Sequence, residues 1–177
     1  MGSFSTASVA VVINTAAYHR VDDCEDHPDD AFLTNAAAVH NLARICRETK
    51  LGGDVKALII AGAGDRAFAA GTDIAAFRDF SVAQDALDYE ARMDKVLGAL
   101  EAVPVPTIAA IAGACTGGGA AIAATCDLRI GTRSLKFGFP IARTLGNCLS
   151  AANYWRLVSL IGEARVTEMI FMSRLVG

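Results

Sequence analysis

Residues 113–130, "GACTGGGAAIAATCDLRI", place three consecutive glycines directly before an alanine-rich segment. The apolar run "TIAAIAG" at 107–113 precedes the glycines and is typical of a buried strand, while "DLRIGT" at 127–132 has the pattern of a second strand. Glycine is unfavourable in regular structure, so a triple marks a point where the backbone comes close to another group. The stretch therefore predicts a strand, a glycine turn, a helix ending near residue 126, and another strand.

Alternating strand and helix patterns extend outward from this stretch. Apolar runs and helical spacing of apolar residues predict strands at 8–14 and 55–62 and helices at 34–50, 85–103, 148–161 and 163–175. Residues 65–77 form a turn-rich connection, and the acidic, proline-containing segment 16–30 is expected to be a mobile loop. This alternation indicates an α/β fold with mainly parallel strands, and the length indicates one domain over residues 1–177.

Composition excludes several classes of partner. The chain has 177 residues, 53% of them apolar and 20% charged, with a net charge of −3. An acidic balance argues against nucleic acid, and no apolar run reaches the ~18 residues of a membrane span. Five cysteines show no zinc-binding spacing, and their odd number fits reduced thiols. We expect a cytoplasmic protein that binds no metal, nucleic acid or membrane.

The first interpretation of the glycine turn is a nucleophile elbow. Gly113, Cys115 and Gly117 fit the pattern G-x-nucleophile-x-G between a strand and a helix. Such a thiol needs a histidine base, which in that fold lies downstream of the nucleophile. All three histidines lie upstream of Cys115, at positions 19, 27 and 40, so this interpretation is not favoured.

A second glycine pattern lies further upstream. Gly62, Gly64 and Ala67 match the dinucleotide fingerprint G-x-G-x-x-A after a predicted strand. That fingerprint requires a helix at once and a second strand about 20 residues later. Gly71 interrupts the segment, and a helix is the next long element, so the match is weak. No phosphate-binding G-x-x-x-x-G-K-[ST] loop occurs.

The third interpretation is an oxyanion hole built from main-chain amides. The first N–H groups of a helix are unpaired and carry partial positive charge, and glycine lets a carbonyl oxygen approach them. Gly118 supplies one donor of this kind. A second donor must come from another loop, and "FAAGTDI" at 68–74 offers a glycine turn after a strand.

These two loops resemble the crotonase (enoyl-CoA hydratase/isomerase) superfamily. "ALIIAGAGDRAFAAGTDI" is similar to the family's strand and "FxAGxD" turn, and "VPVPTIAAIAGACTGGGAAIAATCDLRI" is similar to its "PxIAAIxGxxxGGGxxLALxCDxRI" segment. "FGFP" and "RLVSLIGEARVTEMIFMSRLV" resemble the next two stretches. The resemblance covers residues 55–176, and its motifs occur in the family's order.

The resemblance implies a spiral of ββα units that is truncated or lacks the usual C-terminal helical region. It implies a homotrimer or hexamer and an acyl-CoA thioester as substrate, with coenzyme A as part of that substrate and no separate cofactor. The oxyanion donors would be the backbone N–H groups of Thr72 and Gly118, within about 6 Å of each other in one cleft. Residues implied to contact the substrate are Ala69, Ala70, Gly71 and Gly117.

Two positions depart from the family's pattern. Family hydratases use two glutamates as acid and base around one water. The resemblance places these glutamates at positions 121 and 141, which are Ala121 and Ile141 here. Family isomerases commonly use a carboxylate near the second position. The two backbone donors for a thioester carbonyl are thus expected without the usual proton-transfer groups.

Other side chains near the expected site carry open alternatives. Cys148 in "LGNC" stands where the "GND" of the family's chlorobenzoyl-CoA dehalogenases has its nucleophile, and it is either a reactive thiol at a helix N-terminus or a small buried residue. Arg143 either pairs with a phosphate or carboxylate or is solvated. Asn147 either caps the following helix or points into the pocket. Asp73 is expected to cap a turn or helix.

Two functional classes remain. The first is an acyl-CoA thioester-binding enzyme of the enoyl-CoA hydratase/isomerase type, which stabilises a thioester enolate with both usual glutamates replaced. The alternative is a non-catalytic acyl-CoA-binding or assembly subunit. Backbone oxyanion donors fit both classes, and the sequence indicates neither the acyl group nor the direction of a reaction.

Overall fold

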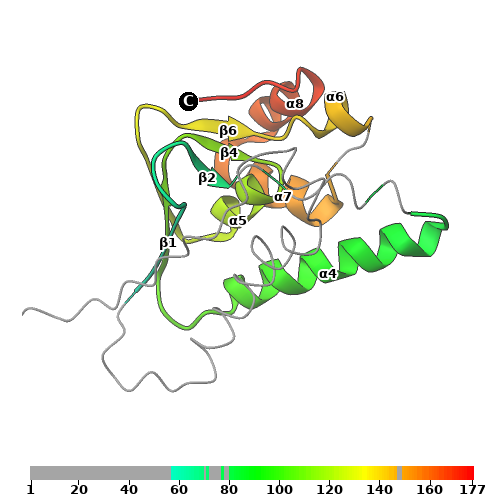
Figure 1. Ribbon diagram of the computed structural model, residues 1–177, viewed down its shortest axis with the longest axis horizontal. Coiled ribbons are helices and arrows are strands. Elements are labelled where there is room, and N and C mark those ends of the chain that lie inside the picture. Colours follow the sequence, from blue (N-terminus) through cyan, green and yellow to red (C-terminus); the bar gives the residue numbers. More distant parts are fainter. Residues whose placement is uncertain (1–56, 70, 72–76, 78–79, 147–148) are drawn as a thin grey trace, which may run out of the picture.

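The computed structural model of the chain describes residues 57–69, 71, 77, 80–146 and 149–177 (Figure 1). The strand, mobile loop and helix expected at 8–14, 16–30 and 34–50 lie outside these described residues.

The described strands form two parallel sheets of three strands each. One sheet has the order β1 (Leu58–Ala61), β3 (Thr107–Ile111), β5 (Leu128–Gly131), and the other has the order β2 (Ala67–Ala69), β4 (Ala114–Thr116), β6 (Lys136–Gly138). All four strand pairs are parallel. The prediction of an α/β fold with parallel pairing is therefore confirmed.

Successive turns of the chain repeat one unit. Each turn gives one strand to the first sheet, one to the second sheet, and then a helix: α4 (Ala83–Glu101), α5 (Gly118–Thr125) and α6 (Ile141–Leu145) in that order. Two further helices, α7 (Ala151–Ile161) and α8 (Glu163–Phe171), complete the described part. This is the spiral of ββα units that the resemblance implied, and Figure 1 shows the two sheets beside α5.

The chain changes sheets at Gly113, which the sequence predicted to be the last residue of a strand. The apolar run 107–113 is a strand only to Ile111, and β4 in the other sheet begins directly after Gly113, which has φ +63°. A β-carbon at Gly113 would overlap the carbonyl group of Arg66, which accepts a hydrogen bond from Ala114 N at 3.0 Å. Glycine is therefore required at this corner.

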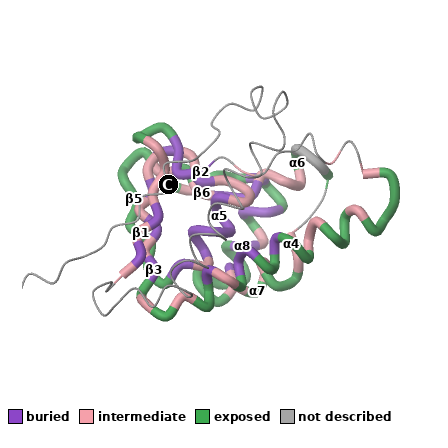
Figure 2. The backbone as a smooth tube through the Cα atoms, turned by 60° about the horizontal axis from the view of Figure 1, so that its bottom comes forward, coloured by how far each residue is buried: buried purple, intermediate pink, exposed green. Residues whose placement is uncertain are grey.

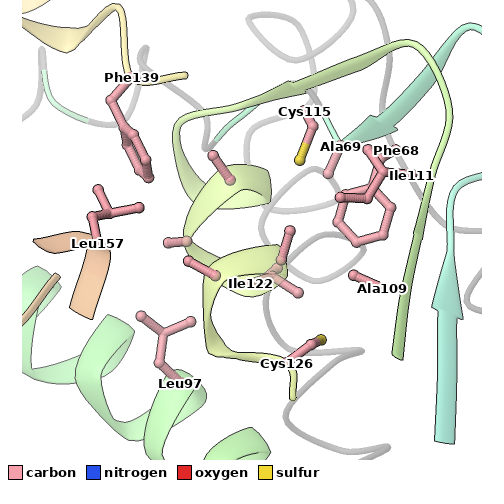
Figure 3. Close-up of a cluster of buried hydrophobic side chains, with 14 of the residues drawn as sticks. Phe68, Ala69, Leu97, Ala109, Ile111, Cys115, Ile122, Cys126, Phe139 and Leu157 are labelled. Atoms are coloured by element: carbon pink, nitrogen blue, oxygen red, sulfur yellow. The ribbon is translucent and has the colours of Figure 1, made fainter. Parts of the chain in front are cut away.

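The helix α5 is the centre of the main core. Its residues 119–124 are all buried, and it packs against α4, α7, β2 and β4 (Figure 2). Larger side chains close in from the neighbouring elements, among them Phe139, Leu157 and Leu97 (Figure 3). A helix surrounded on every side has room only for small side chains, which explains the run of alanines in this segment.

Candidate functional site

The last two glycines of the triple, Gly118 and Gly119, begin α5, and the first, Gly117, is its N-cap. Gly117 has φ +54° and ψ −122°, a conformation that favours glycine. Its N–H donates to the Gly138 carbonyl at 3.1 Å, and its own carbonyl accepts from Ala121 N at 3.0 Å. Among the residues that the structure describes, the N–H of Gly118 has no hydrogen-bond acceptor. The turn thus leaves a main-chain donor open at a helix N-terminus.

The second glycine turn lies directly against the first. A β-carbon built on Gly117 would lie 3.4 Å from the Cα atom of Gly71, and one built on Gly71 would lie 3.7 Å from the Thr116 carbonyl oxygen. Gly71 has φ +129°, again in the region that favours glycine. Thr72 and Ala70 lie outside the described residues, so the second donor and the shared cleft stay predictions.

The third glycine of the triple, Gly119, is required by close packing of α5 against β2. A β-carbon at Gly119 would overlap the carbonyl oxygen of Ala69 and lie 2.6 Å from its β-carbon. Ala69 is only 9% exposed and belongs to the same core. The glycine triple therefore combines a left-handed cap, an open donor and a close approach of helix to strand. Ala69 is placed beneath the start of α5, and its proposed contact with a substrate stays untested.

The two positions expected to carry glutamates are apolar and packed. Ala121 is 6% exposed in the first half of α5, and Ile141, the first residue of α6, packs against the main core. Neither side chain can donate or accept a proton. The described residues therefore offer no carboxylate at these two positions.

The described thiols are unsuited to nucleophilic catalysis. Burial raises the pKa of the Cys115 thiol to about 12, and burial also raises the pKa of the Cys126 thiol to about 11. Both thiols are free, and Cys115 is fully buried. A thiol in this state is neither ionised nor accessible near neutral pH. The geometry therefore also argues against a nucleophile elbow at Cys115.

Arg143 lies on the surface in the last turn of α6. Its side chain is exposed and forms no ion pair with any other described residue. This agrees with the solvated alternative, while a contact with a bound phosphate or carboxylate stays a prediction.

The helix after α6 begins later than the sequence predicted. Its first residue is Ala151, and Ser150 is the N-cap, whose hydroxyl accepts a hydrogen bond from Asn153 N at 3.4 Å. The expected start at residue 148 is therefore wrong, because a serine two residues further on supplies the cap. Asn147 and Cys148 lie outside the described residues, and so does Asp73.

A cluster of polar side chains lies at the C-terminal end of α5, and the sequence predicted no role for it. The guanidinium of Arg129 donates to the carbonyl oxygens of Cys126, Ala123 and Ala124 at 2.5, 3.3 and 3.4 Å. Arg129 is a residue of β5, which begins directly after Asp127. In the sequence, these polar side chains appear in "CDLRI". No local sequence pattern predicts their hydrogen-bond partners.

Asp127 and Thr107 tie the start of β5 to the start of β3. The Asp127 carboxylate accepts from Thr107 N at 2.7 Å and from its hydroxyl at 2.8 Å, and that hydroxyl oxygen lies 2.9 Å from Asp127 N. These hydrogen bonds, the backbone one first, lower the pKa of the Asp127 carboxyl. The cluster therefore connects α5 to both neighbouring strands of one sheet.

Searches for other kinds of site give negative results within the described residues. None of their helices is both long and apolar enough to cross a membrane. No group of three or more His, Cys, Asp or Glu side chains in this part of the chain is placed to hold a metal ion. The candidate functional site is formed by the glycine turns at the start of α5, because the Gly118 N–H is open there and Gly71 lies against Gly117.

Comparison with known sequences gives one consistent family. The family model for enoyl-CoA hydratase/isomerase matches residues 32–177. The chain is 36% identical over 123 residues to a crotonyl-CoA hydratase of Syntrophomonas wolfei, covering 70% of this chain and 46% of that protein. It is 30% identical over 149 residues to a short-chain-enoyl-CoA hydratase of Clostridium acetobutylicum, covering 84% and 56%. The chain thus spans about half the length of these relatives.

Solved structures agree with the sequence comparison. An enoyl-CoA hydratase/carnithine racemase from Magnetospirillum magneticum superposes with a TM-score of 0.76 at 29% identity, over 97% of this chain and 60% of the other. Fold, motif order and family match converge, and the chain belongs to the enoyl-CoA hydratase/isomerase family of the crotonase superfamily.

Proposed function

We propose that this chain binds an acyl-CoA thioester and holds its carbonyl oxygen with two backbone N–H groups, those of Gly118 and Thr72. The observation that carries the proposal is the contact between the two glycine turns, Gly71 against Gly117, next to the open N–H of Gly118. Family membership supports the nature of the ligand. Coenzyme A is part of the substrate, and no separate cofactor is proposed.

Two main-chain donors at this place suit the chemistry of a thioester enolate. Negative charge that develops on the carbonyl oxygen is stabilised by donors that are already oriented, and the partial positive charge of a helix N-terminus adds to this effect. The amide of Gly118 is held in place by the cap at Gly117 and the packing of Gly119. We therefore propose an enzyme of the enoyl-CoA hydratase/isomerase type.

The proposed reaction does not depend on the two usual glutamates. Hydration needs one group that activates water and one that delivers a proton, and each is typically worth ~10²–10⁴ in rate. Ala121 and Ile141 supply neither. The same observation favours a second candidate, an acyl-CoA-binding or assembly subunit without turnover. Cys148, Asn147 and Arg143 remain proposed contacts to the substrate in the catalytic case.

We also propose a cytoplasmic homotrimer or hexamer. Three apolar residues of α8, Val166, Met169 and Ile170, are buried within the chain itself and give this proposal no support. The support that remains is Phe171 and Met172, which are 79% and 71% exposed. Exposed apolar side chains of this size are common at subunit interfaces.

Assays of turnover and binding on the same acyl-CoA panel separate the two candidates. For wild-type protein we expect weak or undetectable hydration of crotonyl-CoA together with measurable binding of the thioester, because the backbone donors do not depend on side chains. The double variant Ala121→Glu, Ile141→Glu should raise hydratase activity if the protein remains folded. Turnover of any thioester in the panel by the wild type would favour the enzyme.

The opposite result would contradict the assignment of residues. Hydration of crotonyl-CoA at about 10 per second or faster, a rate typical of enzymes, would show that a proton-transfer group exists elsewhere in the chain. The first residues to substitute would then be Asp73 and Cys148. Failure to bind any acyl-CoA would reject both candidate functions.

A further inference from the structure

The helix that carries the Gly118 donor has almost no polar side chains of its own. Its eight residues are "GGAAIAAT", and the only polar side chain is that of Thr125 in the last turn, which donates to the Ala121 carbonyl at 2.9 Å. The cap at Gly117 and the packing of Gly119 against Ala69 hold the first turn of the helix. Polar contacts from outside the helix hold its last turn.

At the C-terminal end these contacts come from one side chain. The guanidinium of Arg129 donates to three carbonyl groups of the last turn through one nitrogen, and its other terminal nitrogen donates to the Asp127 carbonyl at 3.2 Å. The last carbonyl groups of a helix have no partners within the helix and carry partial negative charge, so a cation is favourable there. A planar guanidinium can reach several of them at once.

Arg129 is itself fixed by the sheet. It pairs with Ala109 in the register of β3 and β5, and the strand is tied to β3 at its start by the reciprocal hydrogen bonds between Asp127 and Thr107. The sheet thus fixes the backbone from which the Arg129 side chain reaches the end of α5. Because α5 is about 12 Å long, this anchor lies at the far end of the helix from Gly118.

We propose that Arg129 is a positioning residue for the oxyanion donor: anchored through Asp127 and Thr107, it fixes α5 along its axis and so places the Gly118 amide. This inference rests on the proposed function of the Gly118 amide. Arg129 touches no substrate. It acts through the helix, and a displacement of the donor by about 1 Å would be enough to weaken the interaction with a carbonyl oxygen strongly.

The test uses Arg129→Met and Arg129→Lys in the full chain. Arg129→Met removes the charge and every donor, while Arg129→Lys keeps the charge but cannot match the planar geometry. Arg174→Met is the matched control, because Arg174 is an exposed arginine like Arg129 and also forms a charged hydrogen bond, at 2.8 Å, but to Glu168 of α8 and not to α5. Thermal unfolding identifies any variant that does not fold.

Two ligands separate positioning from general destabilisation. The first is an arylacryloyl-CoA thioester, whose absorption band moves to longer wavelength when its carbonyl group is polarised. The second is coenzyme A, which has no thioester carbonyl. We expect Arg129→Met to lose most of the spectral shift and to bind the thioester about tenfold more weakly, with unchanged affinity for coenzyme A. Arg129→Lys should be intermediate, and Arg174→Met should match the wild type.

Each other outcome has a defined meaning. An unchanged spectral shift in both Arg129 variants would overturn the positioning role, as would an equal loss of affinity for both ligands. Should Arg129→Met not fold, the comparison of Arg129→Lys with the wild type decides between the same outcomes. Wild-type protein that binds the thioester without any spectral shift would reject the proposed function, and the inference with it.

Discussion

The two ends of α5 differ in how the unpaired backbone groups of a helix terminus are satisfied. At the C-terminal end, the last carbonyl groups accept hydrogen bonds from Arg129. At the N-terminal end, the Gly118 N–H has no acceptor among the described residues, although Gly117 and Gly119 on either side are tightly constrained. The carbonyl groups at the C-terminal end are thus hydrogen-bonded within the protein, while the N–H group at the N-terminal end is held in place but has no acceptor among the described residues. That difference supports the proposal that the N-terminal end of α5 binds a ligand.

The largest effect on the free energy of unfolding is expected where α5 contacts β2. Gly119→Ala adds a β-carbon that overlaps the Ala69 backbone, so α5 must move away from β2, and we expect a loss of about 1–3 kcal/mol in the free energy of unfolding. The matched control is Gly98→Ala in α4, an exposed helical glycine with open space around it. That substitution should stabilise the protein by about 0.5–1 kcal/mol. Urea unfolding measures both.

Equal and small effects of these two substitutions would break the comparison between the two ends of the helix. Such a result would mean that the N-terminal end of α5 is loosely packed and can accept a side chain. The open amide of Gly118 would then be an ordinary frayed helix start.

A smaller effect is expected at the C-terminal end of α5. There the free energy of unfolding should depend on pH through Asp127. Hydrogen bonds from Thr107 lower the pKa of Asp127 in the folded protein. The stability that this carboxylate contributes is therefore present above about pH 4, its unfolded range, and is lost as the pH falls through the lower folded value. Asp127→Asn should flatten the acid limb of a plot of unfolding free energy against pH.

Asp65→Asn is the control for this experiment, because that exposed carboxylate accepts no hydrogen bond from another described residue. It should leave the acid limb unchanged. An Asp127→Asn curve parallel to that of the wild type would show that the link between β3 and β5 does not contribute through the charge of Asp127.

Much of this arrangement could be predicted from local sequence. The glycine triple, the start of α5 after it and the parallel alternation of strands and helices are confirmed. They are accessible because a long apolar run and three glycines constrain the chain strongly wherever they occur. The strands β2 and β6 and the helix α6 were not predicted, since runs of three to five residues have too little periodicity to be recognised.

The parts that could not be predicted depend on distant residues. Glycine is required at the sheet change because Gly113 lies against the backbone of Arg66, and the Asp127 carboxylate binds Thr107, 20 residues away. No local pattern shows these partners. The contact between Gly71 and Gly117 is of the same kind, although the resemblance of both loops to one family indicated that they belong together.

The central claim is that the Gly118 amide donates a hydrogen bond to the carbonyl oxygen of a thioester. The most direct measurement is the NMR chemical shift of the Gly118 amide proton while an acyl-CoA thioester is added, with the thioether analogue that lacks the carbonyl group as the matched ligand. The Ala151 amide, at the equivalent first position of α7, is the internal reference. We predict that Gly118 moves downfield with the thioester and not with the thioether, while Ala151 stays unchanged with both. Identical behaviour of the Gly118 proton with both bound ligands would contradict the account.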